Sequence, residues 1–210
     1  MQKRNTAYQR RTSKLSTRQK SLLSQSHFLL SIDDHETLQR FIADKDTYCE
    51  IGFGKGDHLL KQAKTYPSNH YLGIDLYKQG ISKVLGEIEN TNLSNIRLLE
   101  ADATEIFEAQ IPTHTLKHID ILHPDPWPKK RHHKRRLITS GFLKLLMTRL
   151  QPNGTCRIIS DDASYTEWIH EILCSSHISF TVEENCTPIT KYGKKAVLVG
   201  NNITTYILKS

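Results

Sequence analysis

The sequence predicts an α/β fold with a mostly parallel sheet and helices on both of its faces. Strand-like apolar runs alternate with helix-like segments through most of the chain, which is typical of parallel sheets. The two strand-like runs nearest the C-terminus have no good helix between them, so we expect the sheet to close with an antiparallel strand. A length of 210 residues suits one domain of this kind and leaves little room for a second.

Hydrophobic spacing gives the expected order of the elements. Apolar runs bounded by turn residues predict seven strands, at Thr47–Phe53, Tyr71–Leu76, Asn95–Ala101, His118–His123, Thr155–Ser160, Phe180–Glu184 and Ile203–Leu208. Helix-like apolar spacing predicts five helices, at 35–43, Asp57–Thr65, Gln79–Glu89, Leu137–Leu150 and Tyr165–Ser175. We expect Asp162 to cap the last helix and residues 186–202 to form a loop.

The positive charge of the chain is concentrated in two segments. Residues 1–20 hold seven Lys or Arg and no acid, and the rest of the chain is neutral, with 22 basic and 22 acidic residues. We therefore expect a flexible basic arm over residues 1–20, followed by a single domain over 21–210. The second concentration has six Lys or Arg within residues 129–136. Two basic clusters on a neutral body favour a nucleic-acid partner, although a solubilising arm and a solvated helix face remain the alternatives.

Composition argues against a membrane protein and a secreted one. No apolar stretch approaches the roughly 18 residues that a membrane span needs, and the first residues contain no apolar signal segment. The four cysteines are scattered and form no CxxC pair, which indicates reduced thiols in a cytoplasmic protein. The adjacent His132 and His133 have no carboxylate or cysteine at ligand spacing, so we predict no metal site.

Residues 50–56 read Glu-Ile-Gly-Phe-Gly-Lys-Gly and join a predicted strand to a predicted helix. Glycines at 52, 54 and 56 (Gly52, Gly54, Gly56) let the backbone turn tightly and approach a ligand closely. Asp57 stands where the dinucleotide-binding fingerprint has its last glycine, so this is not that fingerprint. The carboxylate of Glu50 would repel a pyrophosphate, but it suits a cation such as the sulfonium and amino group of S-adenosylmethionine.

Acidic residues also end the next two predicted strands. Asp75 follows Gly56 by 19 residues, a spacing at which a carboxylate can accept both hydroxyls of a ribose. Asp102 ends the third strand, where it could accept a hydrogen bond from an adenine amino group. Each acid alone is also common as a helix cap or turn residue. Together with the glycine loop, they favour a site for a nucleoside-containing cofactor.

Residues 124–128 read Pro-Asp-Pro-Trp-Pro and follow a predicted strand. Proline fixes φ and donates no backbone hydrogen bond, so this segment ends the strand and holds Asp125 in an extended backbone. Ligands of open α/β sheets bind at this end of the strands. Asp161, at the end of the fifth predicted strand, borders the same edge. A fixed carboxylate beside six basic residues indicates a site that acts on a polyanion.

These segments resemble the bacterial tRNA (guanine-N7-)-methyltransferases. The resemblance is carried by Glu-Ile-Gly-Phe-Gly-Lys-Gly, Gly-Ile-Asp, Ala-Asp-Ala and above all Pro-Asp-Pro-Trp-Pro-Lys-Lys-Arg-His-His-Lys-Arg-Arg-Leu, and it runs from about residue 10 to the C-terminus. It implies a seven-stranded Rossmann-like class I methyltransferase fold. It also implies S-adenosylmethionine as methyl donor and the variable-loop guanosine of tRNA as acceptor, in a monomer or a homodimer.

The resemblance also implies roles for individual residues. Cofactor contacts would come from the glycine loop and from Glu50, Asp75, Asp102 and Asp125, and Asp125 would also be the catalytic residue. Guanosine or nearby tRNA would be contacted by six further residues, Lys129, Asp161, Thr190, Lys191, Tyr192 and Gly193. Phosphates of the tRNA backbone would be bound by Lys130, Arg131, Lys134, Arg135 and Arg136.

The chain departs from the family pattern at Gly193. The family usually has Thr-Lys-Phe/Tyr-Glu followed by Arg-Gly, whereas residues 190–196 here read Thr-Lys-Tyr-Gly-Lys-Lys-Ala. If the missing acid reads the guanine edge, recognition here is weaker or is supplied by another group. Two alternatives therefore stay open: a methyltransferase with another target such as rRNA or a protein, and a non-catalytic RNA-binding protein that keeps the fold.

Guanine N7 carries an in-plane lone pair, so its methylation needs no general base. The protein has to align the reactants and place negative charge near the purine as it becomes cationic. Asp125 fits that electrostatic role, or a hydrogen bond to the N1 and N2 donors of guanine. Trp127 suits base stacking and packing at the turn about equally well.

Overall fold

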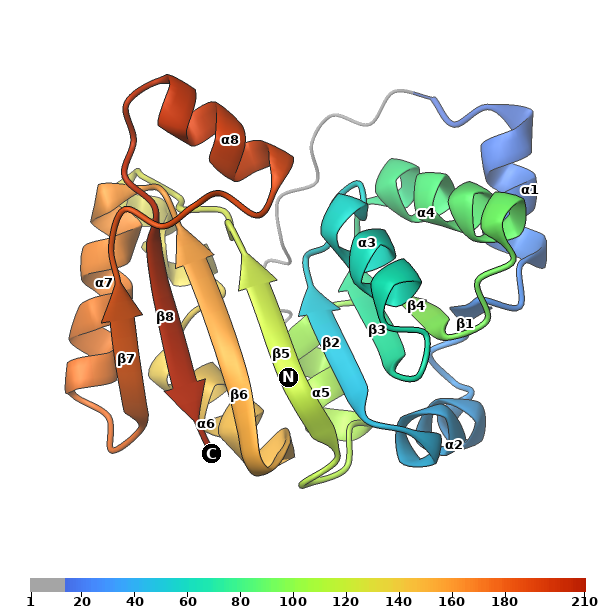
Figure 1. The fold of residues 1–210 in the computed structure, drawn as a ribbon, viewed down its shortest axis with the longest axis horizontal. Helices are drawn as coiled ribbons and strands as arrows, with labels where there is room; N and C mark the ends of the chain where they lie inside the picture. The colour runs from blue at the N-terminus through green and yellow to red at the C-terminus, as the bar shows by residue number, and fades with distance from the viewer. Residues whose placement is uncertain (1–13) are drawn as a thin grey trace.

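The computed structural model describes residues 14–210 and contains one eight-stranded sheet (Figure 1). Its strands are β1 (Leu29–Leu30), β2 (Thr47–Ile51), β3 (His70–Asp75), β4 (Ile96–Glu100), β5 (Leu116–Leu122), β6 (Leu150–Ser160), β7 (Ser179–Glu183) and β8 (Thr204–Lys209). They lie in the order β1-β4-β3-β2-β5-β6-β8-β7, and only β8 pairs antiparallel with its neighbours. The predicted fold class is confirmed, with the two-residue β1 as one strand more than expected.

The helices in the described residues are α1 (Thr17–Gln25), α2 (His35–Asp44), α3 (Asp57–Thr65), α4 (Lys78–Thr91), α5 (Ala103–Ala109), the 3₁₀ helix η1 (Lys130–Arg135), α6 (Ser140–Arg149), α7 (Ala163–Cys174) and α8 (Lys191–Leu198). All five predicted helices are present, and Asp162 caps α7 by accepting from the backbone N–H of Tyr165, as predicted. The sequence did not predict α1, α5 or α8, and α8 replaces part of the loop expected over 186–202. None of these helices is long and apolar enough to cross a membrane.

Two apolar cores lie on opposite faces of the sheet. One is built with α1, α3 and α4, and the other with α2, α5, α6 and α7 (Figure 1). The alternation of side chains along a strand explains the division, because Leu72 and Ile74 of β3 join the second core while Tyr71 joins the first. The cores hold the parallel strands β2 to β6 so that their carboxyl ends share one edge, at the top of Figure 1.

The N-terminal segment becomes helical at Thr17, where α1 begins. The flexible arm was predicted over residues 1–20, and residues 1–13 of it lie outside the described part of the chain. Residues 17–20 are not an arm, because they form the first turn of α1. That helix begins with a capping box in which Ser16 and Gln19 exchange hydrogen bonds between side chain and backbone. Leu22 then buries its side chain in the core beside α4.

Candidate functional site

The glycine loop connects β2 to α3 at the carboxyl edge of the sheet. Gly52, Gly54 and Gly56 have φ values of 73°, 56° and 71°, a left-handed conformation that favours glycine. At Gly56 a Cβ would lie 2.1 Å from Val84 Cγ2, so a side chain there would force α4 away. At the other two glycines no atom lies within 4 Å of the Cβ position, which leaves the outer side of the loop open to a ligand.

Asp75 ties the end of β3 to this loop. Its Oδ2 accepts a hydrogen bond from the backbone N–H of Gly54 at 2.7 Å, and its Oδ1 accepts from that of Tyr77 at 2.8 Å. Burial raises the pKa of the Asp75 carboxyl, the backbone hydrogen bonds counteract this, and the nearby charge of Asp125 adds to the increase. The structure therefore ties Asp75 to the glycine loop, and the charge of Asp125 acts on the same carboxyl from the turn after β5.

Asp102 follows β4 by two residues at the same edge and caps α5. Its Oδ1 accepts from the backbone N–H of Thr104 at 2.8 Å, which occupies part of the carboxylate that the sequence assigned to a cofactor. The cap also explains a missed element, since α5 is only seven residues long and too short to show a helical pattern.

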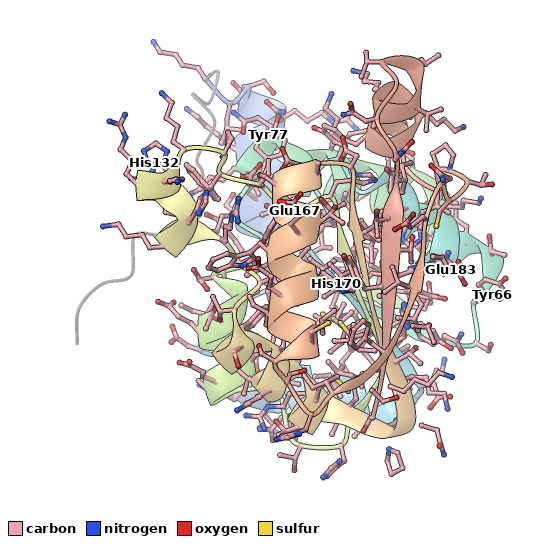
Figure 2. The ribbon with its side chains drawn as sticks, turned by 90° about the vertical axis from the view of Figure 1, so that its left-hand side faces the viewer. Tyr66, Tyr77, His132, Glu167, His170 and Glu183 are labelled. Atoms are coloured by element: carbon pink, nitrogen blue, oxygen red, sulfur yellow. The ribbon has the colours of Figure 1, made fainter. Side chains whose placement is uncertain are left out.

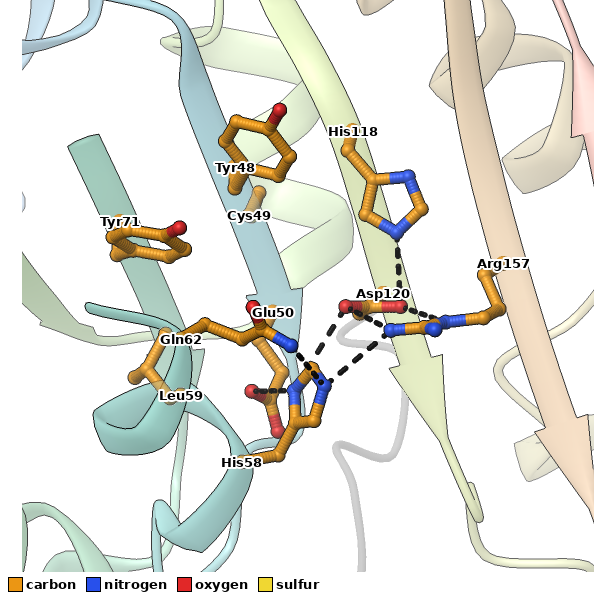
Figure 3. A pocket seen from close by; sticks show the side chains of 10 residues that line it. All are labelled: Tyr48, Cys49, Glu50, His58, Leu59, Gln62, Tyr71, His118, Asp120 and Arg157. Atoms are coloured by element: carbon orange, nitrogen blue, oxygen red, sulfur yellow. Dashed lines mark hydrogen bonds and ion pairs between the residues drawn. The ribbon is translucent and has the colours of Figure 1, made fainter. Parts of the chain in front are cut away.

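Glu50 lies elsewhere, inside β2 on the side that faces α3. Its carboxylate is 3.1 Å from His58 Nδ1 and its residue is only 5% exposed, so burial raises the pKa of the carboxyl. Across the sheet Glu50 stands in register with Asp120 of β5, which stands in register with Arg157 of β6. These side chains line a pocket of about 210 Å³ that the other three predicted cofactor acids do not line (Figure 3). The expected grouping of Glu50 with those acids is not what the structure has, because strand alternation turns Glu50 toward α3.

Asp120 and Arg157 form a bidentate ion pair at the centre of this polar row. Arg157 Nε and Nη2 donate to the two carboxylate oxygens at 2.6 and 2.9 Å, and His118 Nε2 lies 3.0 Å from Oδ1 (Figure 3). Burial raises the pKa of Asp120, but the hydrogen bonds and charges of His118 and Arg157 outweigh it and leave the pKa at about 2.

This ion pair predicts a loss of stability in acid. The pKa of Asp120 is about 2 in the folded protein and about 3.9 in an unfolded chain, so the carboxylate contributes about 2–3 kcal/mol above pH 4. That contribution disappears as the pH falls from 4 toward 2. Arg157→Met should cost about 3–5 kcal/mol at pH 7, because it removes the bidentate partner of the buried Asp120 charge and leaves only histidines beside it, and the cost should shrink below pH 3. Urea unfolding from pH 2 to 7 measures this, and a cost that is independent of pH would contradict it.

Arg136 holds the Pro-Asp-Pro-Trp-Pro turn against α7. That guanidinium donates from Nε to the carbonyl oxygen of Pro126 at 2.9 Å and packs over the rings of Tyr165 and Trp168, 5.0 and 5.1 Å from their centroids. Arg136 is only 3% exposed. The prediction that it binds tRNA phosphate is therefore wrong, since a phosphate cannot reach it. The turn itself leaves Asp125 exposed.

The rest of the basic block is mostly on the surface. Residues 130–135 form η1, and exposed side chains are presented by Lys129, Lys130, Arg131 and Lys134 (Figure 2, where His132 marks η1). Arg135 is half-buried and packs over the Trp127 ring, 5.0 Å from its centroid. His132 meets the same indole edge-on. Trp127 is thus already in contact with its own basic block, which supports the packing interpretation of this residue.

A second group of predicted residues gathers where α8 begins. Thr190 caps α8 by accepting from the backbone N–H of Gly193, and Lys191 Nζ donates to Asp57 Oδ1 at 3.0 Å. Asp161 Oδ1 lies 2.7 Å from Nδ1 of His123, a buried side chain that the sequence reasoning did not identify. The hydrogen bond from His123 draws the pKa of Asp161 below its usual range. Nothing in the pattern around His123 marked it in advance.

Gly193 lies against this histidine, so a side chain there would crowd its neighbours. A Cβ there would lie 3.0 Å from Pro188 Cβ, 3.1 Å from His123 Nε2 and 3.2 Å from Ile203 Cδ1. These distances are slightly shorter than ordinary van der Waals contact, so the acid that the family usually carries would require its neighbours here to shift.

We therefore expect Gly193→Glu to destabilise the protein by about 1–3 kcal/mol and not to increase activity. Thermal unfolding measures the change. Lys194→Glu is the matched control, because it places the same acid on the exposed side of the same helical turn and should leave stability nearly unchanged. A Gly193→Glu protein that is as stable as its parent and more active would show that the acid is accommodated.

Comparison with known proteins shows which protein family the chain resembles. The profile of a family described as putative methyltransferase matches residues 44–206. A tRNA (guanine-N(7)-)-methyltransferase of Legionella pneumophila (strain Paris) is 34% identical over 168 residues, which cover 76% of this chain and 71% of that protein. The protein of the same name from Nitrosococcus oceani is 40% identical over 159 residues, covering 73% of this chain and 67% of the relative.

Solved structures share the fold at low sequence identity. A 30S ribosomal A1408 methyltransferase from an uncultured bacterium superposes with a TM-score of 0.60 at 16% identity, covering 86% of this chain and 95% of that one. A 16S rRNA (adenine(1408)-N(1))-methyltransferase from Catenulisporales acidiphilia gives a TM-score of 0.61 at 14% identity, covering 86% and 92%. These likenesses establish the fold of the chain.

Proposed function

The chain belongs to the tRNA (guanine-N7-)-methyltransferase family, and on that premise we propose that it methylates N7 of the variable-loop guanosine of tRNA. The chain is an enzyme that uses S-adenosylmethionine as methyl donor. The observation that carries the proposal is the position of Asp125, which is exposed on a rigid turn within electrostatic reach of Asp75 and directly before the basic block. We place the activity in the cytoplasm.

The residues at the carboxyl edge fit this methyl donor. The space outside Gly52 and Gly54 is open, and a side chain at either position would fill it. An extended ligand that lies along the loop needs this space. Asp75 keeps acceptor capacity for ribose hydroxyls, since each of its oxygens has two lone pairs and accepts one strong backbone hydrogen bond. Asp102 would contact the adenine with the carboxylate oxygen that does not cap α5. Glu50 would act indirectly, through the first turn of α3 that it holds by His58.

When bound, the sulfonium supplies an electrophilic methyl group, and guanine N7 supplies the electron pair for the new bond. The protein's part is orientation and electrostatics. Asp125 places a fixed negative charge beside a purine that gains positive charge as the bond to N7 forms. Because N7 loses no proton, no general base is required. The carboxylates of Asp75 and Asp102 are therefore assigned to hydrogen bonding and not to proton transfer.

Substrate guanosine would enter between the 124–128 turn and the start of α8. Asp161, held by His123, and the Thr190–Gly193 segment would line that approach. Lys130, Arg131 and Lys134 would bind flanking phosphates from the exposed side of η1, so affinity for tRNA should fall steeply with salt. Arg135 can contribute only the part of its guanidinium that is not packed on Trp127.

The test is methyl transfer from labelled S-adenosylmethionine to unmodified tRNA. A control tRNA has its variable-loop guanosine changed to adenosine, and an rRNA fragment is the competing acceptor. We expect label in the first tRNA alone. Label in both tRNAs would contradict the assigned position, and label in the rRNA alone would point to another RNA target. No transfer with S-adenosylmethionine still bound would favour the RNA-binding alternative.

A further inference from the structure

A basic groove lies between α3, α4 and α8, and of its lining residues the function above has used only Lys191. It has a volume of about 490 Å³, and its charged lining residues are Lys61, Lys64, Lys83, Lys191, Asp57 and Glu87. We call it the α3–α8 groove. Four lysines from three helices, two of them consecutive in the chain and the third about 100 residues later, converge on one hollow. A solvated helix face would instead carry its lysines along a single helix.

The acids of the groove neutralise only half of this charge. Asp57 Oδ1 accepts from both Lys83 and Lys191, at 3.2 and 3.0 Å, and these two ion pairs hold the pKa of Asp57 low although burial opposes them. Lys61 and Lys64 are exposed, and within residues 14–210 they form no ion pair. Like charges concentrated in this way repel one another unless an anion offsets them.

The groove is continuous with the candidate active site. Asp57 directly follows Gly56 of the glycine loop, and Lys191 belongs to the segment that starts α8 beside Asp161 and His123. The groove and η1 lie on opposite sides of the sheet, and the groove runs from the carboxyl edge, where Asp57 begins α3, along that helix to Lys64 in its last turn. Figure 2 shows this arrangement, with His132 of η1 on one side of the molecule and α3 and α8 on the other. A polyanion seated at the edge would therefore meet positive charge on both sides.

We propose that the α3–α8 groove binds backbone phosphates of the tRNA on the side of the acceptor guanosine opposite to η1. The proposal rests on the proposed function, because a guanosine held at the edge has chain leaving it in two directions, each carrying phosphates. Lys61 and Lys64 are the free cations that meet them, and Lys83 and Lys191 are shared with Asp57. A free nucleotide would fill one subsite only and would leave one of the two basic surfaces unused.

The test compares Lys61→Gln/Lys64→Gln with the control Lys45→Gln/Lys144→Gln. The control removes the same charge from exposed positions on the opposite edge of the sheet and on α6. Each phosphate contact releases about 0.7–0.9 of a counterion from the RNA on binding, and this release is lost with the contact. Kd at 0.15 M salt should therefore rise about four- to fivefold for each contact that is lost. The plot of log Kd against log salt should become less steep by about 1.4–1.8 for the groove variant.

At saturating tRNA the groove variant should keep the parent kcat and the parent Kd for S-adenosylmethionine, with the loss confined to KM for tRNA. Groove and control variants with the same Kd and the same salt slope would overturn the proposal. Failure of the proposed function is a separate result, since it would appear as no methyl transfer to tRNA by the unmodified protein. The binding measurement on tRNA then still decides whether the groove takes part.

Discussion

Asp125→Ala should lower kcat for methyl transfer to tRNA by about 10²–10³ while leaving the Kd for tRNA nearly unchanged. The expected size is that of removing one preorganised electrostatic group from a catalytic site. Binding should survive because the phosphate contacts come from the basic residues that follow the turn, on and beside η1. Single-turnover kinetics with saturating S-adenosylmethionine and tRNA measure the chemical step directly.

Asp125→Asn separates the two roles that the carboxylate could play, which are a fixed negative charge and a hydrogen-bond acceptor for guanine. It keeps the size and one oxygen acceptor but removes the charge, so a fall as large as that of Asp125→Ala assigns the effect to charge. The variants should also lower the raised pKa of Asp75, because the charge of Asp125 contributes to it. Near-native turnover of Asp125→Ala would rule out the role assigned to this residue.

Arg136→Lys should lower kcat at least tenfold and destabilise the protein by about 2–4 kcal/mol, although the substitution keeps the charge. A lysine cannot reproduce the hydrogen bond from Nε to Pro126 together with the one from Nη2 to Ser164 Oγ, and it loses the planar packing over Trp168. The turn that carries Asp125 would then lose its brace. Thermal unfolding and kcat are the two readouts.

Lys134→Gln is the matched control for this prediction, because it lies in the same basic block but is exposed. It should raise the Kd for tRNA and flatten the salt dependence with little change in stability. Arg136→Lys should thus change stability and kcat, whereas Lys134→Gln should change the Kd for tRNA. An Arg136→Lys protein of normal stability with weakened tRNA binding would restore the phosphate role that the sequence suggested.

Local sequence patterns predicted the fold well because the central strands and helices have strong periodicity. The helix predicted at Asp57–Thr65 coincides with α3, since its start is fixed by the glycine loop before it. The missed elements have weak signals. The two residues of β1 show no alternation, and α8 has a glycine in its first turn, although the Thr190 cap was a clue that could have indicated a helix.

The site was harder to predict, because burial and strand pairing decide it. Glu50 adjoins the glycine loop in the sequence, but its partners are Asp120 and Arg157, which only the pairing of β2, β5 and β6 brings into register. Arg136 resembles its basic neighbours in the sequence, and the aromatic rings that bury it come from α7. Gly193 could be noticed as a departure, but the His123 imidazole that a side chain there would crowd lies 70 residues earlier in the chain.

The most direct test of the central claim replaces the variable-loop guanosine of an unmodified tRNA by 7-deazaguanosine, which has carbon in place of N7. The account predicts that this tRNA binds as tightly as the guanosine form but accepts no labelled methyl group, whereas the guanosine form is methylated. Equal labelling of the two tRNAs would show that the methyl group goes to another atom or another nucleotide, and would contradict the account.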